Sequence, residues 1–87
     1  MANRYTVYIS KSVRRSIKKI AKSWQRRVIR ALIELEKEPF LGARMRGQME
    51  GRYKIRIWPY RIIYKVDMSN KVIEVLEVGH RGNISYD

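Results

Sequence analysis

The 87-residue sequence contains no cysteine, which excludes disulfide bonds, thiol catalysis and thiolate metal sites and fits a reducing compartment. Histidine is almost absent as well, since His80 is the single one. A ribonuclease mechanism that divides acid and base work between two histidines is therefore excluded. Any catalysis has to use lysine, arginine and tyrosine side chains, with His80 as the one further candidate.

Acidic residues are also scarce: eight Asp and Glu stand against 20 Lys and Arg, which gives a net charge of +12. The acids are scattered along the chain, and their spacing does not resemble a carboxylate–histidine metal site. The glycines do not precede a helix in the pattern of a phosphate-binding loop. We therefore expect neither a metal ion nor a cofactor.

Long apolar runs are missing too. No segment approaches the length of about 20 apolar residues that a membrane-spanning helix needs. The first residues contain no apolar stretch of signal-peptide length. We expect a cytoplasmic protein that has no membrane partner.

Positive charge dominates what is present. So much like charge in a small chain repels itself, which indicates a polyanion or an acidic protein as the partner. A basic domain that is merely soluble is the plain alternative. Apolar residues make up 45% of the sequence, too many for a disordered tail, so we interpret residues 1–87 as a single folded domain. A chain this short buries only about 60% of its surface, so we expect an open face or shallow groove and no small-molecule ligand.

The first half of the chain predicts a strand followed by two helices. Residues 4–9 are β-branched and aromatic, which is typical of a strand. Ser10 or Ser12 can cap a first helix, and Ser23 can cap a second one that ends before Pro39. The apolar residues have helical spacing, at Val13, Ile17, Ile20 and Trp24 and then at Val28, Ala31, Leu32 and Leu35.

The second half predicts three strands. Residues 40–51 lack any period and are interpreted as a loop, after which side chains alternate from Arg52 up to a turn at Trp58-Pro59. Strands at 60–66 and 72–78 follow, and the latter is apolar on both faces, as a central strand is. The order β-α-α-β-β-β predicts an α+β fold in which both helices pack on one face of an antiparallel sheet. Alternating Lys and Arg side chains occupy the other face.

Three basic residues of this open face suit phosphate chemistry. Lys54 and Arg56 share a face by their spacing of two, and Arg61 can lie opposite them after the turn. RNA carries its own nucleophile, the 2′-hydroxyl, and arginine forks match the oxygens of a phosphorane. A lysine among arginines has a lowered pKa and can serve as a general base. On these residues alone, plain RNA binding is favoured over catalysis, and a solvated basic face without a ligand is the third interpretation.

The sequence resembles the RelE/ParE toxin superfamily. The resemblance covers nearly the whole chain and rests on three segments. These are Tyr53-Lys54-Ile55-Arg56-Ile57 followed by Tyr60-Arg61-Ile62-Ile63-Tyr64, the closing Val78-Gly79-His80-Arg81-Gly82-Asn83-Ile84-Ser85-Tyr86, and the opening strand with the basic helix pair. The resemblance implies a RelE-type endoribonuclease that enters the ribosomal A site and cuts mRNA there by attack of the 2′-hydroxyl.

The resemblance also implies a role for each site residue. Lys54 becomes the candidate base, because Arg56 stands where the family often has a lysine and arginine accepts protons poorly. Arg61 matches a phosphate-stabilising arginine. Arg81 matches the arginine proposed to stabilise the phosphorane or to protonate the leaving group. Tyr86 matches a tyrosine that stacks on a nucleobase.

Four further residues are left with open roles. If Arg81 faces the RNA, then the adjacent His80 faces away from it on an extended segment. Trp58 has the parity of the basic strand residues, so contact with RNA and a structural role at the turn stay equally open. Tyr60 and Tyr64 are expected to belong to the core.

Partners and alternatives follow from the same resemblance. The implied partners are the ribosome with its mRNA and a cognate antitoxin, RelB-like and acidic, that neutralises the basic toxin. A ParE-like inhibitor of DNA gyrase is the alternative within the superfamily. A non-catalytic protein that binds RNA or the ribosome is the alternative outside it.

Overall fold

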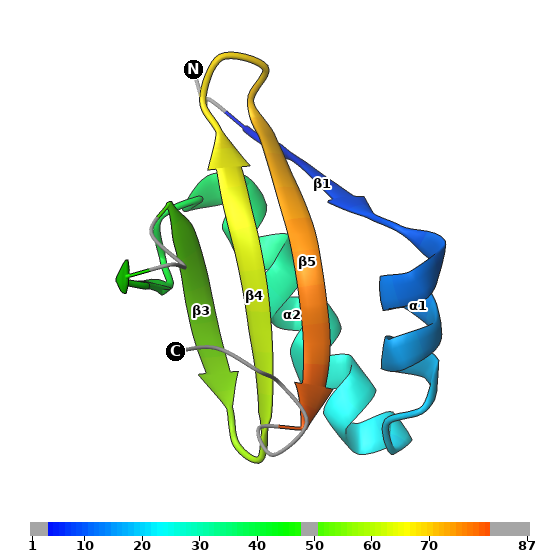
Figure 1. Ribbon diagram of the computed structural model, residues 1–87. Helices are drawn as coiled ribbons and strands as arrows, with labels where there is room; N and C mark the ends of the chain where they lie inside the picture. Colours follow the sequence, from blue (N-terminus) through cyan, green and yellow to red (C-terminus); the bar gives the residue numbers. More distant parts are fainter. Residues whose placement is uncertain (1–3, 48–50, 81–87) are drawn as a thin grey trace.

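The computed structural model describes residues 4–47 and 51–80, which form one sheet with both helices on one of its faces (Figure 1). The elements are β1 (Thr6–Ile9), α1 (Lys11–Lys18), α2 (Lys22–Lys37), β2 (Ala43–Arg44), β3 (Arg52–Ile57), β4 (Tyr60–Asp67) and β5 (Val72–His80). The predicted α+β class and the predicted order of the main elements are confirmed. Among the described residues, no helix is both long and apolar enough to cross a membrane.

The strand order in the sheet is β1-β5-β4-β3-β2. Strands β3, β4 and β5 are antiparallel neighbours, and β5 is a central strand as predicted. Two details differ from the expected antiparallel sheet: β1 pairs with β5 in parallel, and the two-residue β2 forms within the expected loop. The direction of β1 follows from the helix pair, which crosses over the sheet before the chain returns to it. An alternating pattern identifies a strand but not the direction of its neighbour.

The two helices begin at different kinds of residue. Ser10 caps α1, because its side-chain oxygen accepts a hydrogen bond of 3.2 Å from the Val13 backbone N–H. The predicted cap at Ser23 is wrong: α2 begins at Lys22 with Ala21 in the cap position and no side-chain cap bond. Gln25 of α2 instead donates to the Ile20 carbonyl at 2.7 Å, which ties the start of α2 to the short segment that follows α1.

Replacing Ser10 by alanine is expected to lower the free energy of unfolding by about 1 kcal/mol, because α1 loses its one side-chain cap. Ser23→Ala, inside the first turn of α2, serves as the matched control and is expected to change stability by less than about 0.5 kcal/mol. Urea denaturation followed by circular dichroism measures both changes. Equal losses in the two variants would contradict the assignment of Ser10 as the cap.

The main core lies between the helices and the sheet. It is built by the following buried residues: Val13, Ile17, Ile20, Val28, Leu32, Leu35, Ile62, Tyr64, Ile73, Val75 and Val78. Tyr64 is fully buried and stacks on Tyr53, with ring centroids 5.5 Å apart, so its predicted place in the core is confirmed. On the other face, Met45 from the loop covers Ile63 in a second, small cluster. The rest of that face is free to carry polar side chains.

Candidate functional site

Lys54, Arg56 and Arg61 meet on the sheet face opposite the helices. Arg56 on β3 is the direct cross-strand partner of Arg61 on β4, and Lys54 lies two residues along β3 on the same face. The residues that alternate with them, Ile55 and Ile62, belong to the helix-side core. Direct partners in antiparallel strands have Cβ atoms about 4.5–5.5 Å apart. The register therefore produces the predicted grouping of the three basic residues on one face, and Lys54, Arg56 and Arg61 together form the basic row.

The three side chains differ in their surroundings. Arg61 is only 9% exposed, whereas Arg56 lies at the surface. The pKa of Lys54 is lowered, first because the ammonium group loses solvent and then because Arg56 and Arg61 repel its charge. Concentrated positive charge beside a lysine that gives up its proton more readily is an arrangement that can hold a phosphate and accept a proton.

The same row continues onto β5 at Gly79, the direct partner of Arg61. Because Gly79 has no side chain, β5 places no side chain directly beside Arg61. The next pair in register is Tyr60 with His80, whose rings meet edge to face at 5.8 Å. Tyr60 packs against the helix-side core, so His80 lies on the face away from Arg61.

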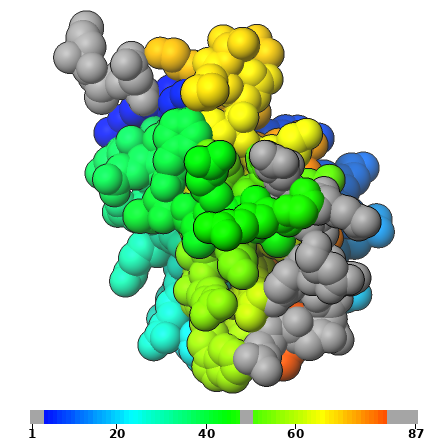
Figure 2. Space-filling view, turned by 60° about the vertical axis from the view of Figure 1, so that its left-hand side comes forward, coloured from blue at the N-terminus to red at the C-terminus, as the bar shows by residue number. Residues whose placement is uncertain are grey.

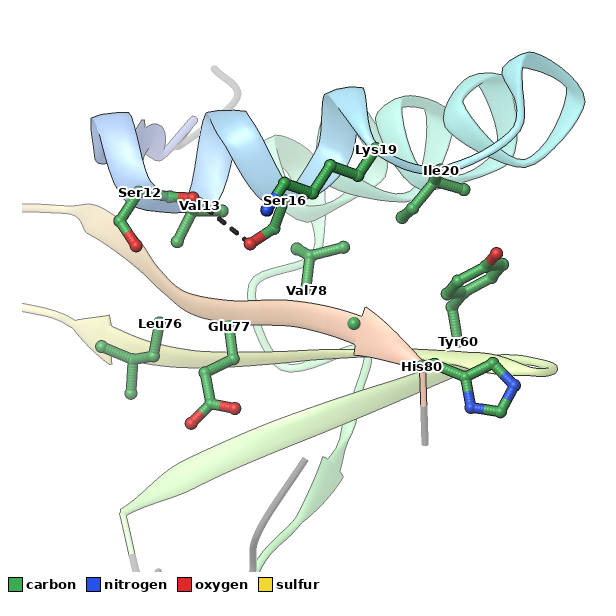
Figure 3. Close-up of a pocket in the computed structure, with 11 residues that line it drawn as sticks. Ser12, Val13, Ser16, Lys19, Ile20, Tyr60, Leu76, Glu77, Val78 and His80 are labelled. Atoms are coloured by element: carbon green, nitrogen blue, oxygen red, sulfur yellow. Dashed lines mark hydrogen bonds between the residues drawn. The ribbon is translucent and has the colours of Figure 1, made fainter. Parts of the chain in front are cut away.

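His80 thus borders a different feature, a pocket between α1 and the end of β5. Figure 3 shows Tyr60 and His80 at one end of this pocket, with Ile20 above Tyr60 and with Val13 and Ser16 of α1 toward the other end. The pocket is on the helix side of the sheet. His80 is therefore not brought together with Lys54 and Arg61, whereas the expectation that it faces opposite to Arg81 depends on a residue outside the described ones.

Arg81 and Tyr86, the two remaining predicted site residues, lie outside the described residues. Their assigned roles stay predictions. Within residues 4–47 and 51–80, no three His, Asp or Glu side chains come together in a way that could hold a metal ion.

Gly42 fastens the loop beside Lys54 and was not predicted as a site residue. Its backbone N–H donates a hydrogen bond of 2.9 Å to the Tyr64 hydroxyl. A Cβ atom at this position would stand 2.7 Å from the Lys54 carbonyl oxygen and 2.9 Å from the Tyr64 hydroxyl oxygen. Only glycine lets the loop approach β3 so closely. The one signal in the sequence was indirect: a buried tyrosine needs a partner for its hydroxyl.

Gly42→Ala is therefore expected to lower the free energy of unfolding by about 1–3 kcal/mol, since the loop has to move away from β3. Tyr64→Phe removes only the hydrogen bond and is expected to cost about 1 kcal/mol. Thermal denaturation of both variants measures the difference. A Gly42→Ala protein as stable as wild type would show that the loop does not depend on this close approach.

Comparison with known proteins places the chain in a family. The family model described as "ParE toxin of type II toxin-antitoxin system, parDE" matches residues 7–84. The chain belongs to this family and is a type II toxin–antitoxin toxin of the RelE/ParE superfamily, as the resemblance in its sequence indicated.

The similar proteins include toxins named RelG and RelE. Toxin RelG of Mycobacterium tuberculosis (strain ATCC 25618 / H37Rv) is 29% identical over 86 residues, which span 92% of this chain and 94% of RelG. The toxin–antitoxin complex RelBE2 of M. tuberculosis matches with a TM-score of 0.81 and 28% identity over 90% of this chain and 99% of the other. The archaeal RelE–RelB complex of Pyrococcus horikoshii OT3 matches with a TM-score of 0.74 and 30% identity over 97% and 100% of the two chains.

Proposed function

We propose that this toxin is a ribosome-dependent endoribonuclease that cuts mRNA in the A site. The observation that carries the proposal is the convergence of Lys54, Arg56 and Arg61 on one open face, with the pKa of Lys54 lowered. The likeness to RelG and to RelE chains supports it further. An open face suits a substrate that is presented by a larger particle rather than enclosed in a pocket.

In the proposed reaction, side chains of the toxin accept and donate the protons and stabilise the negative charge, so no metal ion is needed. Neutral Lys54 accepts the proton of the 2′-hydroxyl, and the 2′-oxygen attacks the adjacent phosphorus. Arg56 and Arg61 stabilise the negative charge of the phosphorane. The bond from phosphorus to the 5′-oxygen then breaks, which leaves a 2′,3′-cyclic phosphate. We assign to Arg81 the stabilisation of the phosphorane or the proton for the departing 5′-oxygen.

Tyr86 is assigned to base stacking, which is worth about 1–3 kcal/mol per base. The roles of Tyr86 and Arg81 are inferred from the resemblance in the sequence. Cleavage measurements on variants of these two residues test the roles.

The chemistry is tested by the nature of the products. An mRNA with a single 2′-deoxyribose at the cleaved nucleotide is expected to stay intact at that position, because the nucleophile is missing. The matched all-ribose mRNA is expected to give 2′,3′-cyclic phosphate ends. Cleavage of the deoxy substrate at the same bond would overturn the assignment of the 2′-hydroxyl as nucleophile.

We further propose that an acidic, RelB-like antitoxin binds this toxin. The solved relatives include RelE–RelB complexes, and the net charge of +12 favours an acidic partner. Ile29 and Ile33 lie one turn apart on α2 and are 47% and 50% exposed. This outer face of α2 fits the apolar side of an amphipathic partner segment.

Inhibition of DNA gyrase is the second candidate function, and the family model that bears the ParE name favours it. The basic row favours the nuclease, because Lys54 can accept a proton while Arg56 and Arg61 stabilise the charge on the phosphate during RNA cleavage. Gyrase-trapped DNA breaks in the presence of intact mRNA would support the second candidate.

A further inference from the structure

A groove runs along the surface between α2 and the end of β3. It is lined by Trp24, Arg27, Arg30, Ala31 and Glu34 of α2 and by Arg56, Ile57 and Trp58 at the end of β3. In Figure 2, the yellow-green segment around β3 and the cyan-to-green α2 lie side by side at the lower part of the surface. The lining combines apolar and aromatic side chains with three arginines and one acid.

The groove stays open because the sheet edge is short here. The pairing of β2 with β3 ends at Ala43 and Lys54. In the part of the chain that the structure describes, no strand pairs with the outer edge of β3, the edge away from β4, from Arg56 onwards. A ligand can therefore approach the groove from the side of the sheet.

The lining of the groove has the chemistry of a surface for single-stranded RNA. Trp58 is 61% exposed, which is unusual for so large an aromatic ring and offers a face for a nucleobase. Arg27 lies over the Trp24 ring at 4.6 Å, so its guanidinium is held at the groove wall. Three arginines face a single acid, Glu34, which favours a ligand with negative charge.

The groove is continuous with the candidate site because Arg56 belongs to both. Arg56 is the cross-strand partner of Arg61 and also lines the groove. An RNA strand that has a phosphate at Arg56 and Arg61 can continue past the end of β3 into the groove. An acidic peptide would satisfy the arginines as well, but this continuity with a phosphate-binding row favours RNA.

We propose that this groove is a second RNA subsite, in which Trp58 stacks on a base next to the cleaved bond while Arg27 and Arg30 hold the flanking backbone. The subsite rests on the proposed function, since the row at Arg56 and Arg61 defines where the cleaved bond lies. It gives the toxin a hold on the RNA outside the reacting nucleotide.

The test uses antitoxin-free toxin and a short single-stranded RNA with 2′-O-methyl groups throughout, which cannot be cut by attack of the 2′-oxygen. Trp58→Ala is expected to raise the Kd about tenfold or more, measured by fluorescence anisotropy. Arg30→Ala is expected to reduce the slope of log Kd against log salt by about 0.7. Tyr8→Ala, an exposed aromatic on β1, and Arg26→Ala, an exposed arginine of α2 outside the groove, are the matched controls and are expected to behave as wild type.

Three outcomes would overturn the subsite: no RNA binding by the folded wild type, wild-type binding by Trp58→Ala and Arg30→Ala, or equal losses in the controls. A Trp58→Ala protein that keeps its RNA affinity but loses an acidic antitoxin would assign the groove to protein. Cleavage on ribosomes is measured separately with the wild type. Groove-dependent RNA binding without any cleavage would therefore contradict the nuclease, and the groove would remain an RNA-binding surface with no cleaved bond beside it.

Discussion

The Arg61→Ala toxin is expected to cleave ribosome-bound mRNA about 100- to 1000-fold more slowly than wild type, the usual loss for removal of one group that stabilises an oxyanion. Arg61 is nearly buried beside Arg56, where its charge is less screened by water than on an exposed side chain. Single-turnover cleavage of mRNA on purified ribosomes measures the rate.

The control for Arg61→Ala is Lys65→Ala. Lys65 lies on the same strand and belongs to the same face, but its cross-strand partner is Arg52 rather than a residue of the basic row. The control is expected to cleave at nearly the wild-type rate. Circular dichroism has to show that both variants fold. Full activity in a folded Arg61→Ala protein would remove Arg61 from the site.

The second large effect concerns Lys54. Lys54→Ala is expected to lower the cleavage rate about 100- to 10,000-fold, the range for loss of a general base. In wild type the rate rises with pH as Lys54 loses its proton, and this rise lies below the ordinary pKa of lysine. The Lys54→Ala protein is expected to lose this rise. An unchanged pH profile in the variant would mean that another group accepts the proton.

Arg56→Gln tests the direction in which the pH dependence of the cleavage rate shifts. After loss of solvent, Arg56 has the larger effect of the two charges that lower the pKa of Lys54, so its removal raises this pKa. The rise in rate then moves to higher pH, whatever the loss in maximal rate. Lys65→Gln, the control, is expected to leave its position unchanged. A shift to lower pH in Arg56→Gln would contradict Lys54 as the base.

The basic row was predictable because it depends on local pattern. Alternation from Arg52 and the break at Trp58-Pro59 define a hairpin, and a hairpin with a short turn places Arg61 opposite Arg56. The strand period and the position of the turn were therefore enough to predict the part of the site that lies on β3 and β4.

The remaining features depend on packing between distant segments. To predict the parallel pairing of β1, one has to know where the chain re-enters the sheet after the two helices. The close approach of Gly42 to Lys54 depends on a tyrosine that lies 22 residues away in sequence. The groove at Trp58 exists only because α2 packs beside the uncovered end of β3. No local pattern in the sequence encodes these contacts.

Ribosome-dependent cleavage is tested by primer extension on an mRNA held in purified translating ribosomes, with the same mRNA free of ribosomes as the control. We expect new 3′ ends inside the A-site codon, absent from the naked mRNA and lost with Arg61→Ala and with Arg81→Ala. Intact mRNA on ribosomes, with a folded toxin that is free of antitoxin, would show that the toxin is not a ribosome-dependent nuclease and would make gyrase the next target to assay.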